Sequence, residues 1–438
     1  MLGRLADPAL YIASAERVRA RQWRNGDLRP LCEGGPRLAA LGEQLPTLAR
    51  RLAREVGRGQ YAFGAVEPRR TFIEGKERVL SVATPLDDIV LGALAELLRE
   101  IVEPTWGDRL HSYRRGRSPW TAIDAFRAYL REHIAAWPDP RQRGLYLIRR
   151  DVRAYGDAIP VGPDSRLWSQ LSAALARARI ELSPDRMRWL TGAFRPALAG
   201  AHERPMRGVP TGSSLQPIAC NLYLGPIDEI AARVPGCFYA RYGDDMLFAH
   251  PDPDVTERST RQIDDAIAEL ELELSRDKCA ALYFNGAGRA SDRPGFRGVS
   301  GCDYLGVQID FRGSIKLRRD KLQDLLLDAK ARLRRSDRML IHVERARRAE
   351  TLCQVINAAL DPSHRLAHAS ASVLRSRIDD RGQLRDLDYK IANLIARALC
   401  HRRGPRAFRR HSPRRLRTQN GLTSLVRARD RLALARRS

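Results

Sequence analysis

The stretch from Cys237 to His250, which reads Cys-Phe-Tyr-Ala-Arg-Tyr-Gly-Asp-Asp-Met-Leu-Phe-Ala-His, constrains the fold more than any other part of the chain. Aromatic and aliphatic residues flank Gly243-Asp244-Asp245, which predicts two short strands joined by a tight turn with a positive φ at the glycine. Burying an unpaired carboxylate is costly. The acid pair is therefore either solvated on a surface hairpin or neutralised by hard cations such as Mg²⁺, which prefer carboxylate oxygens.

A third acid follows a similar apolar run. Residues 144–150 read Gly-Leu-Tyr-Leu-Ile-Arg-Arg, and Asp151 stands where this predicted strand should end. A strand adjacent to the hairpin would bring Asp151 to the same place as Asp244 and Asp245. Paired metal ions roughly 3.5–4 Å apart stabilise both the attacking and the leaving oxygen in phosphoryl transfer. The three acids together predict a site for that chemistry.

Asp151-Val-Arg-Ala-Tyr155 and Tyr242-Gly-Asp-Asp245 resemble the first and third palm motifs of reverse transcriptases, in the order that family uses. The resemblance implies an α+β right-hand polymerase, with fingers, a palm of antiparallel sheet plus helices, and an α-helical thumb. It also implies two Mg²⁺ ions, with Mn²⁺ as an alternative, bridged by Asp151 and Asp244 and assisted by Asp245. The three aspartates are the expected catalytic residues, and the expected metal site comprises Asp151, Val152, Asp244 and Asp245.

The resemblance extends to the nucleotide site. Lys76 and Arg78 alternate on a predicted strand, where the family holds the triphosphate with a pair of cations; a solvated strand face is the alternative. Tyr155 resembles the steric gate that leaves no room for a 2′-hydroxyl, although a ring at this position can also be a packing residue. Lys278 matches the lysine that assists the leaving pyrophosphate. The remaining expected nucleotide contacts are Val152 and Gln216.

Three further segments resemble nucleic-acid contacts of the family. Residues 207–217 resemble the second palm motif, a Gly-rich loop that opens a long helix capped by Ser213 or Ser214, but Pro-Thr-Gly-Ser-Ser replaces the usual Pro-Gln-Gly-Ser-Pro. Residues 112–118 resemble an arginine-rich fingers loop, and residues 302–313 predict a primer-grip hairpin. Surface charge and a core strand are the respective alternatives. The expected nucleic-acid contacts are Arg114, Arg117, Gly212, Ser213, Tyr304, Leu305 and Gly306.

Periodicity and composition suggest four regions. Residues 1–56 form a basic helical extension, 57–312 the fingers and palm, 313–400 a helical thumb and 401–438 an arginine-rich extension. A helix is expected to open at Asp7-Pro8, another to contain the leucines from Leu38 to Leu52, and a third to run from Asp264 to Leu274. The final region has 13 Arg and one acid, which is typical of a nucleic-acid-binding segment that orders on contact.

The charge predicts a polyanionic partner, because 77 Lys and Arg against 52 Asp and Glu give +25. A solubility device or a basic tail alone is the alternative. The seven scattered cysteines favour reduced thiols in a cytoplasmic protein, and no stretch predicts a signal peptide or a membrane span. The expected partners are an RNA template, a DNA product and either a partner protein or a second copy, without a membrane.

The predicted function is RNA-directed DNA polymerisation, in which a primer 3′-hydroxyl is extended with dNTPs. In motif style the chain is closest to stand-alone bacterial reverse transcriptases of the defence-associated, abortive-infection and unknown groups, which implies anti-phage defence with a non-coding RNA. Retron and intron-type reverse transcriptases are alternatives. An RNA-dependent RNA polymerase shares Gly-Asp-Asp, but Tyr155 argues against it. An idle, RNA-binding maturase-like protein has no reason to keep clustered carboxylates.

Overall fold

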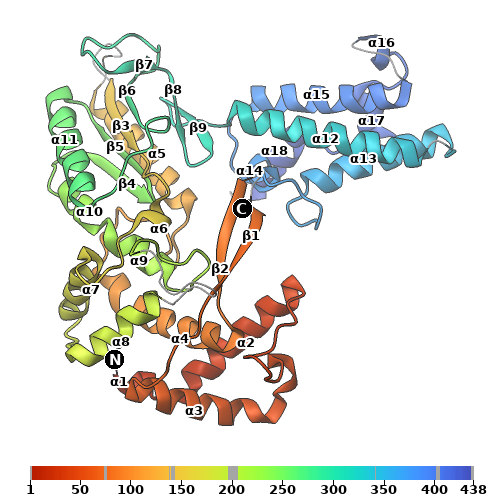
Figure 1. The fold of residues 1–438 in the computed structure, drawn as a ribbon. Coiled ribbons are helices and arrows are strands. Elements are labelled where there is room, and N and C mark those ends of the chain that lie inside the picture. The colour runs from red at the N-terminus through yellow and green to blue at the C-terminus, as the bar shows by residue number, and fades with distance from the viewer. Residues whose placement is uncertain are drawn as a thin grey trace. The chain divides into compact units, whose positions relative to one another are not determined.

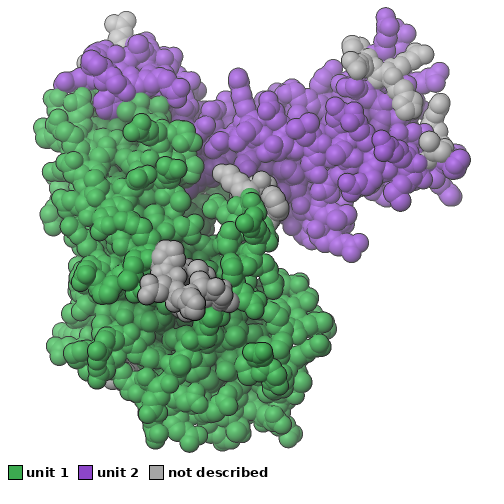
Figure 2. Space-filling model, viewed as in Figure 1, with its two compact units in different colours: residues 1–126, 145–282 green, residues 127–144, 283–438 purple. Residues whose placement is uncertain are grey.

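The computed structural model describes residues 2–73, 76–137, 139, 144–195, 206–340, 342–400 and 405–435. The chain forms two compact units (Figures 1 and 2). Unit 1 comprises residues 1–126 and 145–282, and unit 2 comprises residues 127–144 and 283–438. Helices and antiparallel sheets occur together, which confirms the predicted α+β class. The four predicted regions are functional subdomains that this division does not test, and they stay predictions.

Unit 1 combines helices with a hairpin and a larger sheet. Its elements are α1 (Leu2–Leu5), α2 (Pro8–Asn25), η1 (Leu38–Ala40), η2 (Gly42–Gln44), α3 (Leu45–Arg58), β1 (Glu67–Ile73), β2 (Lys76–Val82), α4 (Pro85–Val102), η3 (Glu103–Thr105), β3 (Leu145–Arg150), α6 (Tyr155–Ala158), α7 (Arg166–Arg177), α8 (Pro184–Phe194), α9 (Gln216–Tyr223), α10 (Gly225–Ala232), β4 (Phe238–Tyr242), β5 (Asp245–His250) and α11 (Pro253–Glu269). Two elements, α5 (Pro119–Ala136) and β6 (Ala280–Phe284), contribute residues to both units.

In the larger sheet, β5 lies between β4 and β3. β4 and β5 form the predicted hairpin, with Gly243 at φ 64° in the turn. β3 pairs antiparallel with the other side of β5, and β6 follows β3. Leu147, Leu247 and Phe248 are almost completely buried. Because both faces of these strands are covered, their apolar runs are nearly continuous, and the charged residues are left at the strand ends.

The N-terminal helices confirm one prediction and correct another. The Asp7 side chain accepts a hydrogen bond of 2.9 Å from the Ala9 amide, so α2 opens at Asp7-Pro8 as predicted. The helix predicted across Leu38 to Leu52 begins only at Leu45. Leu38 and Leu41 precede it in short 3₁₀ turns, because Gly42 adopts φ 44° and interrupts the helical path.

Unit 2 contains a small antiparallel sheet and a group of helices. Its elements are β7 (Arg297–Val299), β8 (Gly301–Tyr304), β9 (Val307–Asp310), β10 (Ile315–Leu317), α12 (Arg319–Met339), α13 (Arg345–Leu360), α14 (Ala371–Ser376), α15 (Arg381–Cys400), α16 (Pro405–Phe408), α17 (Pro413–Thr418) and α18 (Leu425–Ala435). The β8–β9 hairpin confirms the strand pair predicted in residues 302–313. The long helices α12, α13 and α15 lie side by side (Figure 1), in agreement with the helical periodicity predicted over residues 313–400.

Residues 405–435 are folded without a nucleic acid, which corrects the prediction that this region orders on contact. Leu416, Leu422 and Leu425 are buried within unit 2. The Asp388 carboxylate on α15 accepts hydrogen bonds from the Ser424 hydroxyl at 2.7 Å and the Leu425 amide at 2.9 Å. The arginine content of residues 401–438 suggested disorder, but three leucines anchor the described part.

Two other helices differ from their predicted bounds. The helix expected at residues 264–274 is α11, which begins after Asp252, whose side chain accepts hydrogen bonds from two amides of the first turn, and ends at Glu269. The long helix expected after the second palm motif is divided into α9 and α10 at Gly225-Pro226. In the described parts of the chain, none of the helices has the length and apolarity that crossing a bilayer requires.

Candidate active site

The sheet brings the three predicted catalytic acids together. The pairing of β3 with β5 ends at Arg150 and Met246, and the antiparallel register therefore carries Asp151 opposite Asp245. Asp244 lies in the tight turn immediately before β5. Residues far apart in sequence thus place three carboxylates at one edge of the sheet.

Burial and mutual repulsion act on these carboxylates. Asp151 is only 5% exposed. Burial, followed by repulsion from Asp151, raises the pKa of Asp244. Burial also raises the pKa of Asp245 to about 6, with the charges of Asp151 and Asp244 adding to the effect and Arg149 opposing it. The site therefore carries more negative charge than its surroundings compensate, which is the electrostatic condition for attracting cations.

Lys278 is a compensating cation in direct contact with the acid cluster. Its ammonium nitrogen lies 2.7 Å from Oδ1 and 2.9 Å from Oδ2 of Asp151. The hydrogen bond to Asp151 raises the pKa of Lys278, with the charges of Asp244 and Asp245 adding to the effect. The predicted pyrophosphate-assisting lysine is thus within the acid cluster, and its side chain keeps 46% exposure toward solvent.

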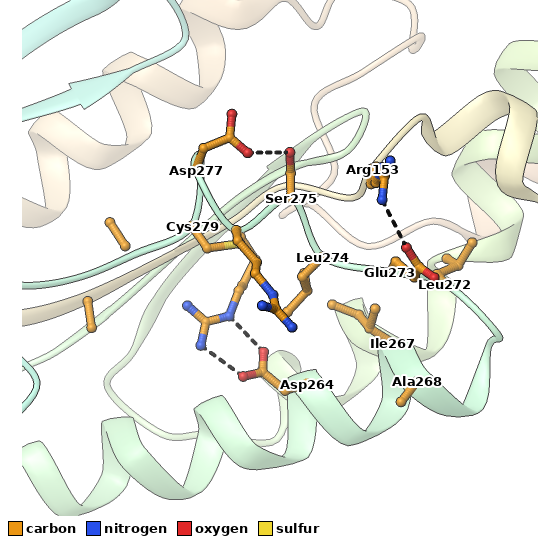
Figure 3. A pocket seen from close by; sticks show the side chains of 14 residues that line it. Arg153, Asp264, Ile267, Ala268, Leu272, Glu273, Leu274, Ser275, Asp277 and Cys279 are labelled. Atoms are coloured by element: carbon orange, nitrogen blue, oxygen red, sulfur yellow. Dashed lines mark hydrogen bonds and ion pairs between the residues drawn. The ribbon is translucent and has the colours of Figure 1, made fainter.

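The backbone around Asp151 is fixed by the segment that leads to Lys278. The Ser275 amide donates to the Asp151 carbonyl at 2.8 Å, and Val152 forms an isolated bridge with Leu274. This segment and α11 line a cavity of about 1150 Å³. Figure 3 shows Ser275 and Cys279 on its wall, with Asp264 of α11 on the other side of the cavity. Asp151 and Lys278 are therefore positioned by one short, hydrogen-bonded loop.

Arg241 is a structural residue that sequence reasoning missed. It is fully buried on β4 and forms a two-pronged ion pair with Asp228 of α10, with nitrogen–oxygen distances of 2.8 and 2.5 Å. Nη1 of Arg241 donates to the Gly243 carbonyl oxygen at 3.3 Å, and Nη2 donates to the Asn221 carbonyl oxygen at 3.0 Å. Arg241 thereby holds the turn that carries Asp244.

The loop before α5 also reaches this turn through Tyr113, which was not among the predicted site residues. Residues 109–111 hydrogen-bond to Arg241 of β4, and Ser112 exchanges hydrogen bonds with Asn221 of α9 at 2.8 and 2.9 Å. The ring of Tyr113 therefore lies 6.5 Å from the ring of Tyr242, centroid to centroid. Burial, with smaller effects that include the charge of Asp244, raises the pKa of Tyr113 to about 12.

Arg114 and Arg117, the predicted nucleic-acid contacts of the same loop, are engaged within the protein. Arg114 donates to the carbonyl oxygens of Gly107 at 2.6 Å and Leu110 at 3.2 Å, and only 11% of its side chain is exposed. Arg117 forms an ion pair of 2.9 Å with Asp108. Arg114 therefore has a structural task in this loop, and the nucleic-acid role of both arginines stays a prediction.

The predicted nucleotide contacts lie on two hydrogen-bonded segments. The Ser81 amide on β2 donates to the Thr211 carbonyl at 2.8 Å, which links the strand of Arg78 to the loop of Gly212. Arg78 is exposed, and its charge lowers the pKa of Asp244 against the larger effect of burial. Lys76 begins β2, but its side chain lies outside the described residues.

Tyr155 and Gln216 flank the start of α9. The ring of Tyr155 is 6% exposed, and its hydroxyl donates to the Cys220 carbonyl at 2.6 Å, so this ring is packed as the alternative interpretation described. Gln216 donates to the Thr211 hydroxyl at 3.3 Å. Ser213 does not cap α9, because its hydroxyl accepts from the Leu215 amide one residue before the helix begins. The substrate roles of Tyr155, Gln216 and Ser213 stay predictions.

The predicted primer grip is a tight turn in unit 2. Leu305 and Gly306 adopt φ 44° and 83° between β8 and β9, and Tyr304 is 1% exposed. A positive φ at Leu305 is uncommon for a residue with a branched side chain. The turn is therefore imposed by the hairpin, and its contact with a primer stays a prediction.

The acid cluster fits Mg²⁺ in chemistry and charge. Asp151, Asp244 and Asp245 offer hard carboxylate oxygens, and their repulsion is the kind that a divalent ion removes. Among the described residues, no three His, Cys, Asp or Glu side chains are already arranged around one ion position. Instead, Lys278 satisfies both oxygens of Asp151, so ion binding requires Asp151 to exchange this partner.

The comparisons with known proteins agree with the motifs. An uncharacterized 91 kDa protein in the cob intron of Schizosaccharomyces pombe is 27% identical over 186 residues, which are 40% of this chain and 20% of that protein. Solved telomerase structures from Candida albicans and Candida tropicalis, each with a fragment of telomeric RNA, are 10% and 12% identical, both with TM-scores of 0.44. They cover 86% and 88% of this chain, and 65% and 68% of their own.

The family described as reverse transcriptase (RNA-dependent DNA polymerase) matches residues 70–309. This range includes the three acids and the primer-grip turn and is more than half of the 438 residues. The chain therefore belongs to the reverse transcriptase family.

Proposed function

We propose that the chain is an RNA-directed DNA polymerase that extends a primer 3′-hydroxyl with dNTPs. The observation that carries this proposal is the convergence of Asp151, Asp244 and Asp245 at one sheet edge in a chain of the reverse transcriptase family. A fold of this family without polymerase activity would not need three clustered carboxylates, two of which, Asp244 and Asp245, have pKa values raised by burial and by their acidic neighbours.

The residues of the acid cluster would hold the metal ions. Asp151, Val152, Asp244 and Asp245 would bind the two Mg²⁺ ions, or Mn²⁺ in their place. When bound, such ions activate the primer hydroxyl and neutralise the departing pyrophosphate. Ser275 keeps the Asp151 backbone in place through its 2.8 Å hydrogen bond.

The cations around the acid cluster bind the nucleotide in this proposal. Lys278 exchanges Asp151 for the phosphate that leaves, and this movement frees both oxygens of Asp151. Arg78, with Lys76, binds the triphosphate, because exposed guanidinium and ammonium groups are suited to that anion. Tyr155 lies under the sugar and favours deoxynucleotides.

Primer extension on an RNA template tests the proposal. Asp244→Asn should lower incorporation of dNTPs by at least about a thousandfold, because it removes one bridging carboxylate from the metal site. Asp265→Asn, at an exposed position of α11, is the matched control and should retain the wild-type rate. Incorporation by Asp244→Asn near the wild-type rate, or a preference for NTPs over dNTPs, would contradict the proposal.

We further propose that the enzyme acts in the bacterial cytoplasm, in anti-phage defence, with a cognate non-coding RNA as template. The motif resemblance to stand-alone bacterial reverse transcriptases supports this setting. Cells that express the chain should yield fewer phage plaques than cells that express Asp244→Asn, and one RNA should dominate the nucleic acid that copurifies with both proteins. Equal plaque numbers would exclude a defence role against the phages tested.

An intron-type reverse transcriptase is the second candidate, because the S. pombe relative is described as a protein in the cob intron. This chain spans only 20% of that protein. The copurified RNA distinguishes the two settings. Reads that extend from intron sequence into flanking exons would favour the intron setting, whereas a discrete RNA without exon junctions would favour a dedicated template.

A further inference from the structure

A groove of about 990 Å³ lies in unit 1 at the C-terminal end of α2, before the residues that match the family. Gly26, at φ 62°, ends α2 and turns the chain back along it. Leu28 and the 3₁₀ turn at Leu38 then form the wall opposite Trp23. This N-terminal groove serves none of the tasks assigned to the polymerase site.

The apolar residues of the N-terminal groove are unusually exposed. Trp23 is 89% exposed and Leu28 is 66% exposed. The buried side of α2 is made by other residues, among them Tyr11, Ala15 and Val18. Trp23 therefore does not stabilise the packing of α2, and an exposed aromatic and aliphatic pair beside a concave surface is typical of a contact site.

A buried donor without a partner also lines this groove. Gln22 is 8% exposed, and its Nε2 nitrogen is buried without a hydrogen-bond partner among the described residues. Gln22 belongs to the same buried side of α2 as Tyr11, Ala15 and Val18, so a bound molecule would reach this nitrogen only after the side chain turns outward.

The rim carries two cations whose charge is not compensated. Arg24 donates to the Ala20 carbonyl, and neither Arg24 nor Arg37 has a carboxylate partner within the described residues. The two acids of the rim are already engaged: Glu16 pairs with Arg19, and Asp27 pairs with Arg29 at 2.8 Å. The hydrogen bond from Arg29 lowers the pKa of Asp27 to about 2, which shows that this acid belongs to its own pair.

We propose that the N-terminal groove docks an acidic polypeptide segment of a partner protein. Apolar side chains of the segment cover Trp23 and Leu28, and carboxylates pair with Arg24 and Arg37. A second copy of the chain is disfavoured, since each copy carries a charge of +25. A nucleic-acid strand is disfavoured because, among the arginines that line the groove, only Arg24 and Arg37 have no carboxylate partner within the described residues.

Selection from a random dodecapeptide library on the full chain tests the proposal. Peptides that bind the wild type are counter-selected against the double variant Trp23→Ala, Leu28→Ala, whose exposed positions leave folding intact by thermal unfolding. The remaining peptides should combine at least two acids with aromatic or aliphatic residues. Their affinity should fall about tenfold or more in Arg24→Glu, Arg37→Glu. Arg17→Glu, on the same helix but outside the groove, is the matched control and should bind normally.

Each other outcome overturns the proposal. The groove is not a polypeptide site if no peptides depend on Trp23 and Leu28, or if those that do are neutral or basic. It is a nucleic-acid site if a ten-nucleotide single-stranded RNA loses affinity in the double variant while no peptide does. Primer extension should be unchanged in the double variant, because the groove lies outside the polymerase site. The Asp244→Asn variant should lose polymerase activity and still bind the selected peptides. The proposed function and the proposed docking site can therefore fail independently.

Discussion

Asp245 illustrates how a residue proposed to be catalytic can weaken the fold that carries it. Its pKa is raised to about 6, first by burial and then by the neighbouring acids. At neutral pH the carboxylate is nevertheless ionised, so the folded protein holds a charge that the unfolded chain would solvate better. The ionised carboxylate therefore lowers stability, a cost that the proposed catalytic role would account for.

The first prediction follows from this cost. Because the folded pKa of Asp245 lies above the unfolded value, the folded state binds more protons between about pH 4 and pH 6, and its stability falls as the pH rises through that window. In metal-free buffer, Asp245→Asn should raise the free energy of unfolding at pH 7.5 by roughly 2–3 kcal/mol. Urea unfolding at pH 7.5 and pH 3.5 measures this difference. A gain of the same size at pH 3.5 would contradict the electrostatic cause.

The second prediction concerns Lys278, which competes with metal ions for Asp151. Lys278→Met should bind Mn²⁺ several-fold more tightly in the absence of nucleotide, because Asp151 loses its competing cation. The same variant should incorporate dNTPs about a hundredfold more slowly if the lysine protonates the leaving pyrophosphate. Electron paramagnetic resonance and single-turnover kinetics measure the two effects. Arg276→Met, in the same loop, is the control, and weaker Mn²⁺ binding by Lys278→Met would refute the competition.

At the scale of elements, α10 and the β4–β5 hairpin are joined by a buried ion pair. Arg241 is completely buried, and Asp228 supplies both of its carboxylate oxygens. The same arginine contacts the Gly243 carbonyl in the catalytic turn. A change in this pair therefore affects both the packing of α10 and the position of Asp244.

The third prediction tests this connection. Asp228→Asn should lower the free energy of unfolding by about 3–5 kcal/mol, because it leaves a buried guanidinium without its counter-charge. Glu229→Gln, on the same helix, removes an exposed ion pair of 3.3 Å with Arg177 and should cost about 1 kcal/mol at most. Urea unfolding compares the two variants. If both variants lose the same free energy of unfolding, the Arg241–Asp228 ion pair does not hold α10 in place.

Local patterns explain which elements could be predicted. The two hairpins were predictable because apolar runs flank short turns with glycine, and α2 because Asp7-Pro8 is a strong start signal. The bounds of α11 were missed although Asp252-Pro253 is the same kind of signal. Arg241 could not be recognised, since an arginine within a strand usually marks a solvated face and its partner Asp228 is identified only by tertiary packing.

For the molecule as a whole, the charge of +25 predicts affinity for RNA that depends strongly on salt. This is the fourth prediction. A single-stranded RNA that contacts six to ten cations should lose at least about a hundredfold in affinity between 50 and 200 mM salt, because bound counterions are released. Fluorescence anisotropy across this range measures the slope. Affinity that changes less than about threefold would show that the excess charge is not used for RNA binding.

The fifth prediction concerns the folded C-terminal segment. A chain that ends at residue 404 should lose roughly 3 kcal/mol or more in the stability of unit 2, because it lacks the buried Leu416, Leu422 and Leu425 and exposes the apolar surface that they cover. Thermal unfolding compares the shortened chain with the full chain. An unchanged melting temperature in the shortened chain would restore the idea of a loose basic tail.

The contacts of Asp388 also determine when unit 2 can finish folding during synthesis. The ribosome makes α15 well before Ser424 and Leu425, so Asp388 lacks these two hydrogen-bond donors until they emerge from the exit tunnel. In a nascent chain, the cluster of Asp151, Asp244 and Asp245 is therefore complete before the helices of unit 2 have finished folding. Translation itself would then delay the moment at which unit 2 can bind a nucleic acid.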